Sequence, residues 1–423
     1  MFKINSLTRK ASTIALAIAC MVPAVSAGAQ TVTDTTACNY EDLPTSIRQT
    51  LIVIDGNVVT HEDKGSAPNE ANNEWRSFLR QFLDAANPEI NSRMAPREYL
   101  TLAMSNPDGS GMTTMFAGCI PTFSAEEDAV KQENDSAMGT FFGSSWKNTR
   151  TKMAEEFVQS ASRGIIEKTQ GVNENTDGVS DFAEGSLVRS LKRSQQIDAS
   201  KGIPRVIFYT DLSKYSFPDG DASAVRRQAF ADAKAAQIDL GRSEVHVMSE
   251  ANPETDGNVD YLPAFFLGSK AELKTLQPAT GSLSTIGSPV SVEVYTGSVR
   301  MGGSEPFPAR MRVATDINGQ LVNSWMEETR TQSRYVPVEG QLSCSGDTCE
   351  YIGKPNFGVV WAENTADPEA MCGDKAPFGG MRILKFEKTG DEVTGELTDT
   401  VCYFEGGDDN VAFDLKLVPN GQW

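Results

Sequence analysis

The sequence predicts an α/β domain with an open, mostly parallel sheet, followed by an all-β sandwich or barrel. Up to about residue 280, continuous apolar runs typical of buried strands alternate with segments of helical periodicity. From Pro289 onward, short strand-like segments are separated by Gly, Asn and Asp turns, without a clear helix. This change of pattern divides the chain into domains at 30–280 and 289–423, joined by a linker at 281–288.

The first part of the α/β domain contains a strand, a helix and a hairpin. The strand is predicted from Ser46 to Asp55, because it ends in the apolar run "LIVI" before the aspartate. The segments "REYLTLAMS" and "MTTMFAGCI" flank the turn "NPDGSG" and predict the hairpin. The helix between strand and hairpin is predicted from apolar residues at i, i+3, i+4, i+7 and i+8, namely Trp75, Phe78, Leu79, Phe82 and Leu83.

Mostly helical sequence from Glu126 to Ile203 leads into the second part of this domain. The run "PRVIFYTD" predicts a second buried strand that ends in Asp211, and a helix follows from about Ala222 to Ile238. Next come the strand "EVHVMS" and the segment "YLPAFFLG", which is expected to be an edge strand or a bend because Pro263 cannot donate to a ladder. A short helix, "SKAELKTL", is expected to close the domain.

The C-terminal domain is predicted from a series of strand-like segments with turn residues between them. In chain order they are "VSVEVYTGSVRM", "ARMRVATDI", "QLVNSWMEE", "FGVVWAEN", "MRILKFEK" and "EVTGELTD". The turn chemistry of "EKTGDEVTG" joins the last two as a hairpin. We therefore expect an all-β fold, but its sequence contains no motif that indicates a function.

The first 29 residues are expected to be a signal peptide. A basic region at Lys3, Arg9 and Lys10 precedes an apolar stretch from Ala11 to Val25, and small residues follow. A lipid anchor at Cys20 is an alternative, because "AIAC" loosely resembles a lipoprotein motif. No other stretch is long and apolar enough to span a bilayer, so we expect an exported protein, periplasmic or secreted, without an integral membrane segment.

The mature chain is expected to be strongly acidic and to contain disulfides. The formal net charge of −19 becomes −22 without the three cations of the signal peptide, which disfavours nucleic acid and anionic lipid as partners. An even number of cysteines in an exported chain indicates disulfides, with one expected in the first half and two in the second. The spacing leaves the pairing of the last four open; the six are Cys38, Cys119, Cys344, Cys349, Cys372 and Cys402.

The order of elements around Asp55 and Asp211 resembles the von Willebrand factor A fold. The pattern covers roughly Asp42 to Pro278: a strand ending in Asp55, an amphipathic helix, a hairpin, and a strand ending in "TD". In that family a metal site lies at the carboxyl end of the sheet, with Asp-x-Ser-x-Ser from the first strand and a threonine and an aspartate from later loops. The resemblance implies oxygen ligands for a hard cation such as Mg²⁺ or Ca²⁺.

Transferred to this chain, the metal site is degenerate. Asp55 matches the first aspartate and Asp211 the later one, while Asn57 stands in place of the first serine. Val59 stands in place of the second serine and cannot ligate, and Ser186 is the nearest candidate for the threonine. The simpler explanation is that the two aspartates are polar ends of buried strands that cap the segments after them.

Within this fold a disulfide is predicted between Cys38 and Cys119. It would tie the segment before the first strand to the end of the edge strand of the hairpin.

A polar loop supplies a second candidate cation site. The segment "NENTDGVSDFAE" fits the calcium-loop template, with Gly178 at the sharp turn and helical sequence on both sides. A solvated loop between two helices explains the same composition. The oxygen-bearing side chains are Asn173, Asn175, Asp177, Asp181 and Glu184.

Three hypotheses of function follow. In the first, an exported, non-enzymatic binding or adhesion protein meets another protein or a matrix polymer with the loop face around Asp55 and Asp211, with or without a divalent cation. In the second, the protein is a dehalogenase-like phosphohydrolase. The segment "IVIDGNVVT" resembles the Asp-x-Asp motif of that family, with Asp55 as nucleophile, although Asn57 replaces the second aspartate, which acts as general acid. In the third, the protein is a structural envelope component with a vestigial metal site.

Overall fold

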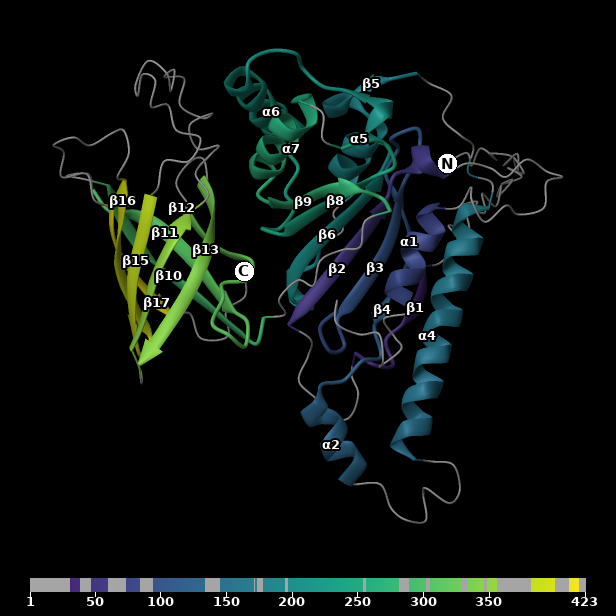
Figure 1. Ribbon diagram of the computed structural model, residues 1–423, viewed down its shortest axis with the longest axis horizontal. Helices are drawn as coiled ribbons and strands as arrows, with labels where there is room; N and C mark the ends of the chain where they lie inside the picture. Colours follow the sequence, from purple (N-terminus) through teal and green to yellow (C-terminus); the bar gives the residue numbers. More distant parts are fainter. Residues whose placement is uncertain are drawn as a thin grey trace, which may run out of the picture. The chain divides into compact units, whose positions relative to one another are not determined.

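The computed structural model describes residues 31–38, 47–59, 74–83, 94–133, 145–170, 172, 178–194, 197–253, 256–280, 289–301, 305–328, 334–345, 348–355, 382–399 and 411–417. Within these ranges it has a seven-stranded, mostly parallel sheet and a closed antiparallel barrel, which confirms the predicted fold class (Figure 1). Both belong to one compact unit, Thr31–Trp423. The expected signal peptide at 1–29 and the linker at 281–288 lie outside the described residues.

The sheet has the strand order β1-β4-β3-β2-β6-β8-β9. Strands β2, β3, β6, β8 and β9 run parallel, whereas β4 pairs antiparallel with β3 and forms the predicted hairpin. From β2 the chain adds strands first on one side and then, from β6, on the other, so β2 and β6 form the topological switch point. The strands are Val32–Asp34 (β1), Arg48–Ile54 (β2), Tyr99–Ser105 (β3), Met112–Cys119 (β4), Ile203–Thr210 (β6), Glu244–Ser249 (β8) and Glu272–Pro278 (β9).

Helices cover both faces of this sheet (Figure 1). Leu51 and Val53 of β2 pack in a core with α5, α6 and α7, while Ile52 and Ile54 pack in a second core with α1 and α4. Burial on both faces explains why β2 is continuously apolar and does not alternate. No helix in the described ranges is long and apolar enough to cross a membrane. The helices are Glu74–Leu83 (α1), Ala125–Glu133 (α2), Trp146–Thr169 (α4), Ser186–Arg193 (α5), Ala222–Ala236 (α6) and Asp256–Gly268 (α7).

The C-terminal strands form a barrel that closes through the pairing of β10 with β17. Its apolar core includes Tyr295, Met311, Phe386 and Val393. Closure leaves no unpaired edge along the described strands, which removes the tendency of a flat sheet to pair with other chains. The strands are Ser291–Met301 (β10), Phe307–Thr315 (β11), Ser324–Glu328 (β12), Arg334–Ser345 (β13), Thr348–Pro355 (β14), Arg382–Thr389 (β15), Glu392–Asp399 (β16) and Val411–Leu417 (β17).

Two elements at the end of the α/β domain differ from the prediction. The segment "YLPAFFLG" belongs to helix α7, which contains Pro263. Its aromatic and aliphatic side chains between Tyr261 and Leu267 are all buried, so the one-sided periodicity that identifies a surface helix is missing there. The segment "SKAELKTL", expected to be a helix, contains most of β9, which pairs in parallel with β8 at the edge of the sheet. Polar residues are tolerated there because an edge strand is only half-covered.

Three barrel strands, β13, β14 and β17, were not predicted from the sequence. The first two form a hairpin around "SGDT", where charged, Gly and Pro residues obscure the alternation. The predicted strand "FGVVWAEN" lies outside the described residues.

A buried carboxylate from the barrel joins the two parts of the unit. Glu327 of β12 is 1 % exposed and pairs with Arg242 at 2.6 Å, Arg310 at 2.8 Å and Lys270 at 3.1 Å. Burial alone would raise the pKa of Glu327, but Arg242, Lys270 and Arg310 lower it to about 2. Since Arg242 and Lys270 belong to the α/β domain, the ion pairs connect it with the barrel.

The indole ring of Trp325 lies at the same junction. The ring is fully buried and packs in the same core as the helices α5 to α7. The guanidinium groups of Arg242 and Arg312 lie 5.4 Å from its centroid, within cation–π distance. Arg312 also donates to the backbone oxygen of Arg242 at 3.0 Å.

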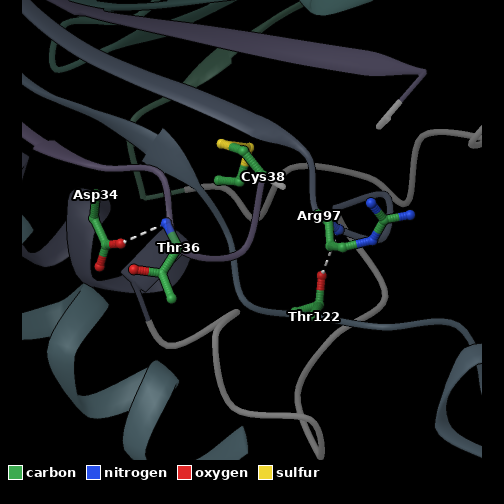
Figure 2. The surroundings of a disulfide bond; sticks show 6 residues. Asp34, Thr36, Cys38, Arg97 and Thr122 are labelled. Atoms are coloured by element: carbon green, nitrogen blue, oxygen red, sulfur yellow. Dashed lines mark hydrogen bonds between the residues drawn. A yellow bond between two sulfur atoms is a disulfide. The ribbon is translucent and has the colours of Figure 1, made fainter. Parts of the chain in front are cut away.

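The disulfide predicted between Cys38 and Cys119 is present. It connects the turn after β1 with the end of β4, with an S–S distance of 2.07 Å and a sequence separation of 81 (Figure 2). Nearby, the Thr36 N–H donates to Asp34, and the Arg97 N–H donates to the Thr122 hydroxyl (Figure 2). A disulfide is typical of proteins that fold in an oxidising compartment, which agrees with export.

The remaining cysteines are only partly described. Cys344 is disulfide-bonded, and the backbone register places it opposite Cys349 in the β13–β14 hairpin. Cys372 and Cys402 lie outside the described residues.

Replacing Cys38 and Cys119 together by serine is expected to lower the free energy of unfolding by about 2–4 kcal/mol, because the disulfide closes a long loop in the unfolded chain. Urea unfolding of the variant and of the wild type measures the difference. An unchanged unfolding midpoint would show that the bond is dispensable for stability.

Candidate functional site

Asp55 lies at the switch point of the sheet. It follows β2 directly, and its N–H donates to the backbone oxygen of Tyr209 in the neighbouring β6 at 2.8 Å. In open α/β sheets, ligands bind outside the carboxyl ends of the strands at this point. The position is therefore the first place to look for a functional group.

The carboxylate of Asp55 is completely buried and receives four hydrogen bonds. Oδ1 accepts from the Asn57 N–H at 3.1 Å and from the Ser105 hydroxyl at 3.3 Å. Oδ2 accepts from the Thr210 hydroxyl at 2.7 Å and from the Tyr215 hydroxyl at 2.6 Å. Both carboxylate oxygens are thus satisfied by groups of the same chain.

Burial and hydrogen bonding act on the proton affinity of Asp55 in opposite directions. Removal from water is the larger effect and raises its pKa above the ordinary value, although the donors, led by the Tyr215 and Thr210 hydroxyls, lower it. The pKa of Tyr215 is raised by burial and by the charge of Asp55. This hydroxyl therefore stays protonated and donates a hydrogen bond to the carboxylate. The arrangement replaces the hydration shell of the carboxylate with fixed donors.

Two glycines allow the elements around Asp55 to approach closely. A Cβ at Gly56 would lie 2.2 Å from the backbone oxygen of Ser105 at the end of β3. A Cβ at Gly185, just before α5, would lie 2.4 Å from the ring of Tyr215. Larger residues at these two positions would push Ser105 and Tyr215 away from the carboxylate.

Three of the four residues predicted for the adhesion-type metal site come together. The Asn57 side-chain amide donates to the Ser186 hydroxyl at 3.0 Å and to the Tyr215 hydroxyl at 3.2 Å, and Tyr215 in turn reaches Asp55. Asn57 belongs to the short helix η1, Gly56–Val58, and Ser186 begins α5. Val59, at the second serine position, is buried in the apolar core.

Asp211 does not take part in this network. It caps the short helix η6, Leu212–Lys214, where its Oδ1 accepts from the Ser213 N–H at 3.0 Å and from the Ser213 hydroxyl at 2.7 Å. Within the described residues, no group of three His, Cys, Asp or Glu side chains is arranged to hold a metal ion. The cation site at Asp55, Asn57, Ser186 and Asp211 stays a prediction.

The calcium-loop candidate is described only at its end. Asn173, Asn175 and Asp177 lie outside the described residues. Asp181 caps the short helix η4, Phe182–Glu184, by accepting from the Ala183 N–H at 2.9 Å, and Glu184 is exposed. Calcium binding by this loop also stays a prediction.

The capping of η1 by Asp55 agrees with the sequence analysis, but sequence reasoning did not identify the hydroxyl donors to Asp55. The tyrosine is 160 residues from the aspartate it contacts, and Ser105 is 50 residues away, so no local motif links them. Tyr215 lies in the short strand β7, Tyr215–Ser216, which pairs with β5, Ser180–Asp181. Thr210, beside Asp211 at the end of a buried strand, is the donor whose position the sequence could have placed near the switch point.

A further carboxylate, Glu250, follows β8 at the same edge of the sheet. Its N–H donates to the backbone oxygen of Thr210 at 2.9 Å, which places it beside the end of β6. Removal from water raises its pKa from the ordinary value of 4.5 to about 7; the charges of Asp211, Glu74 and Asp55 raise it further, while a hydrogen bond with the Tyr209 side chain lowers it. Glu250 therefore changes its charge near neutral pH.

Comparisons with known proteins identify no family. No protein-family model matches the sequence, and no curated protein is similar enough to match. Among solved structures, a point mutant of the PilB minor pilin from Streptococcus sanguinis is similar with a TM-score of 0.26 and 10% sequence identity. The similarity covers 57% of this chain and 59% of that chain, so this chain spans less than two thirds of the pilin. A likeness at this TM-score carries no argument about function.

Replacing Asp55 by alanine is expected to lower the free energy of unfolding by about 2–4 kcal/mol, because several buried donors lose their acceptor. The matched control is Asp211→Ala, which removes a cap on a short helix and is expected to cost less than about 1 kcal/mol. Chemical denaturation of both variants measures the contrast. Equal and negligible losses would favour the hypothesis of a vestigial site.

The raised pKa of Glu250 is expected to make stability depend on pH. Between pH 4.5 and about 7 the folded state binds a proton that the unfolded state has released, so this group's contribution to stability falls as the pH rises. Glu250→Gln removes this loss. The melting temperature of the variant minus that of the wild type should therefore be larger at pH 8 than at pH 5. Glu126→Gln, on the exposed side of α2, is the control and should show no such difference. If the difference in melting temperature between Glu250→Gln and wild type did not change with pH, this would contradict the raised pKa of Glu250.

Proposed function

We propose that this protein is an exported, non-enzymatic binding protein of the cell envelope or exterior. Its binding surface is the loop face at the carboxyl ends of β2, β6 and β8, and its partner is another protein or a matrix polymer. The observation that carries the proposal is the buried carboxylate of Asp55. It occupies the ligand-binding position of the fold, but both of its oxygens already accept hydrogen bonds from the same chain.

The geometry gives no support to a phosphohydrolase. A nucleophilic carboxylate must reach the substrate with an oxygen that can form a bond. Asp55 is 0 % exposed, and its Oδ2 accepts from two hydroxyls. Asn57, at the position of the general acid, uses its amide to donate to Ser186 and Tyr215.

The von Willebrand factor A-like identity is part of the proposal. The strand order β4-β3-β2-β6-β8-β9, with β4 antiparallel, supports it, as does the clustering of Asp55, Asn57 and Ser186. The disulfide between Cys38 and Cys119 supports export. In this proposal a divalent cation, Ca²⁺ or Mg²⁺, is not required, because Oδ2 of Asp55 already accepts from the hydroxyls of Thr210 and Tyr215.

Site-specific photocrosslinking tests which end of the sheet meets the partner. Ser213 and Ser200 are both exposed and lie beyond opposite ends of β6, Ser213 in η6 and Ser200 in the short helix η5, Ala199–Lys201. A photoreactive phenylalanine is placed at either position in the full chain, which is then irradiated with envelope material of the organism that encodes it. We expect a defined adduct from position 213 and none from position 200.

Two outcomes would contradict the proposal. Adducts of equal yield from both positions, or from position 200 alone, would move the binding surface away from the loop face. Turnover of phosphate or ester substrates by the purified protein, abolished by Asp55→Asn, would show that the protein is an enzyme.

A further inference from the structure

A histidine is buried beside the edge strand of the sheet with one of its ring nitrogens unpaired. His246 lies in β8 and is 1 % exposed. Its Nδ1 lies 2.9 Å from the hydroxyl oxygen of Thr275 in β9, so a side-chain hydrogen bond links the two strands. Nε2 is also buried and forms no hydrogen bond within the described part of the chain. Such a polar atom is rare in native proteins and calls for an explanation.

The pairing of β8 with β9 is irregular at this histidine. Val245 is opposite Leu273 and His246 is opposite Thr275, so Lys274 is an extra residue in β9. A bulge of this kind changes the direction of the side chains that follow it, and here it places Thr275 opposite the imidazole. Among the described strands, β9 pairs with β8 alone and forms the edge of the sheet (Figure 1). Its attachment therefore depends on one short ladder and on side-chain contacts such as this one.

Three cations from neighbouring strands act on the imidazole of His246. Burial, followed by the charges of Arg205 in β6, Arg48 in β2 and Lys274 in β9, lowers its pKa from the ordinary value of 6.5 to about 3. The imidazole is therefore neutral in the folded protein at neutral pH. Each carboxylate on the surrounding elements lies beside one of these cations: Glu98 is 2.9 Å from Arg205, Glu244 is 3.9 Å from Arg48, and Glu272 is 2.9 Å from Lys274.

A proton on this imidazole is unfavourable while the strand stays in place. An imidazolium donates from both ring nitrogens, so Nε2 of His246 would be a charged donor without an acceptor. It would also add a further positive charge to a cluster that is removed from water. Because β9 is bound on one side only, its separation breaks a single ladder and brings water to the charged ring.

We propose that His246 controls the attachment of strand β9 and makes this attachment sensitive to acid. Neutral His246 holds β9 to β8 through Thr275; protonated His246 leaves its buried position, and β9 separates from the sheet. Lys270, directly before β9, pairs with Glu327 of the barrel, so this separation also loosens the junction between the two domains. The device lies outside the loop face and does not depend on the identity of the binding partner.

The sign of the pH dependence follows from proton binding. Between pH 6.5 and about 3, the open state binds a proton at His246 that the closed state does not bind. The contribution of this group to the closed state is therefore complete above pH 6.5 and is lost as the pH falls. Lowering the pH from 7.5 to 5 favours the open state by about 30-fold.

Hydrogen exchange measures the opening of β9. After correction for the intrinsic exchange rate, the protection of the hydrogen-bonded amides of β9 in the wild type should fall about 30-fold between pH 7.5 and pH 5. The amides of β2, at the centre of the sheet, should keep their protection. His246→Gln, a neutral side chain that can still reach Thr275, should remove the change. His61→Gln makes the same substitution at the other histidine of the chain and should retain it.

NMR tests the same inference in the wild type without relying on a variant that folds. The chain has two histidines, so the spectrum contains two imidazole spin systems to follow between pH 7.5 and pH 5. The signal of His246 should stay that of a neutral ring in the closed protein. A normal titration with a midpoint near pH 6.5, while β9 keeps its protection, would overturn the proposal.

Three results of the exchange experiment would also overturn it. The first is protection of β9 that does not change with pH in the wild type. The second is an equal fall in His246→Gln and His61→Gln, which would assign the change to other groups. The third is an equal loss of protection in β2 and β9, which would show general acid unfolding and no specific release of the edge strand.

Discussion

A carboxylate that is removed from water must be held by donors of the protein, and Asp55 is the centre of such an arrangement. Its four hydrogen bonds come from the turn after β2, the end of β3, the end of β6 and the short strand β7. Through Asn57 the network extends to Ser186 at the start of α5. The loops on this edge therefore have their positions fixed by one buried group, because each must bring a donor to it.

This constraint separates two kinds of acidic residue at the same edge of the sheet. Asp55 is buried and internally satisfied, so it is unsuited to attack a substrate or to offer an open oxygen to a partner. Glu74, Asp211 and Glu250 are accessible and lack compensating cations in the described chain. The ion pairs of Glu327 attach the barrel to the α/β domain away from this network.

The sequence predicted those features that depend on local pattern. The strands β2 and β6 were predicted because their apolar runs require burial on both faces. The pairing of Cys38 with Cys119 followed from the expected fold. By contrast, α7 was missed because the aromatic and aliphatic residues of its second half are buried without a polar face, and a proline lies inside it. The contact of Tyr215 with Asp55 depends on how the chain folds over 160 residues, which no local pattern encodes.

The most direct test of this account is a double-mutant cycle between Asp55 and Tyr215. The free energy of unfolding is measured for wild type, Asp55→Asn, Tyr215→Phe and the double variant. A buried hydrogen bond to a charged carboxylate predicts a coupling free energy of about 1.5–3 kcal/mol between the two positions. Additive effects, with no coupling, would contradict the claim that Asp55 is held by hydroxyls of its own chain.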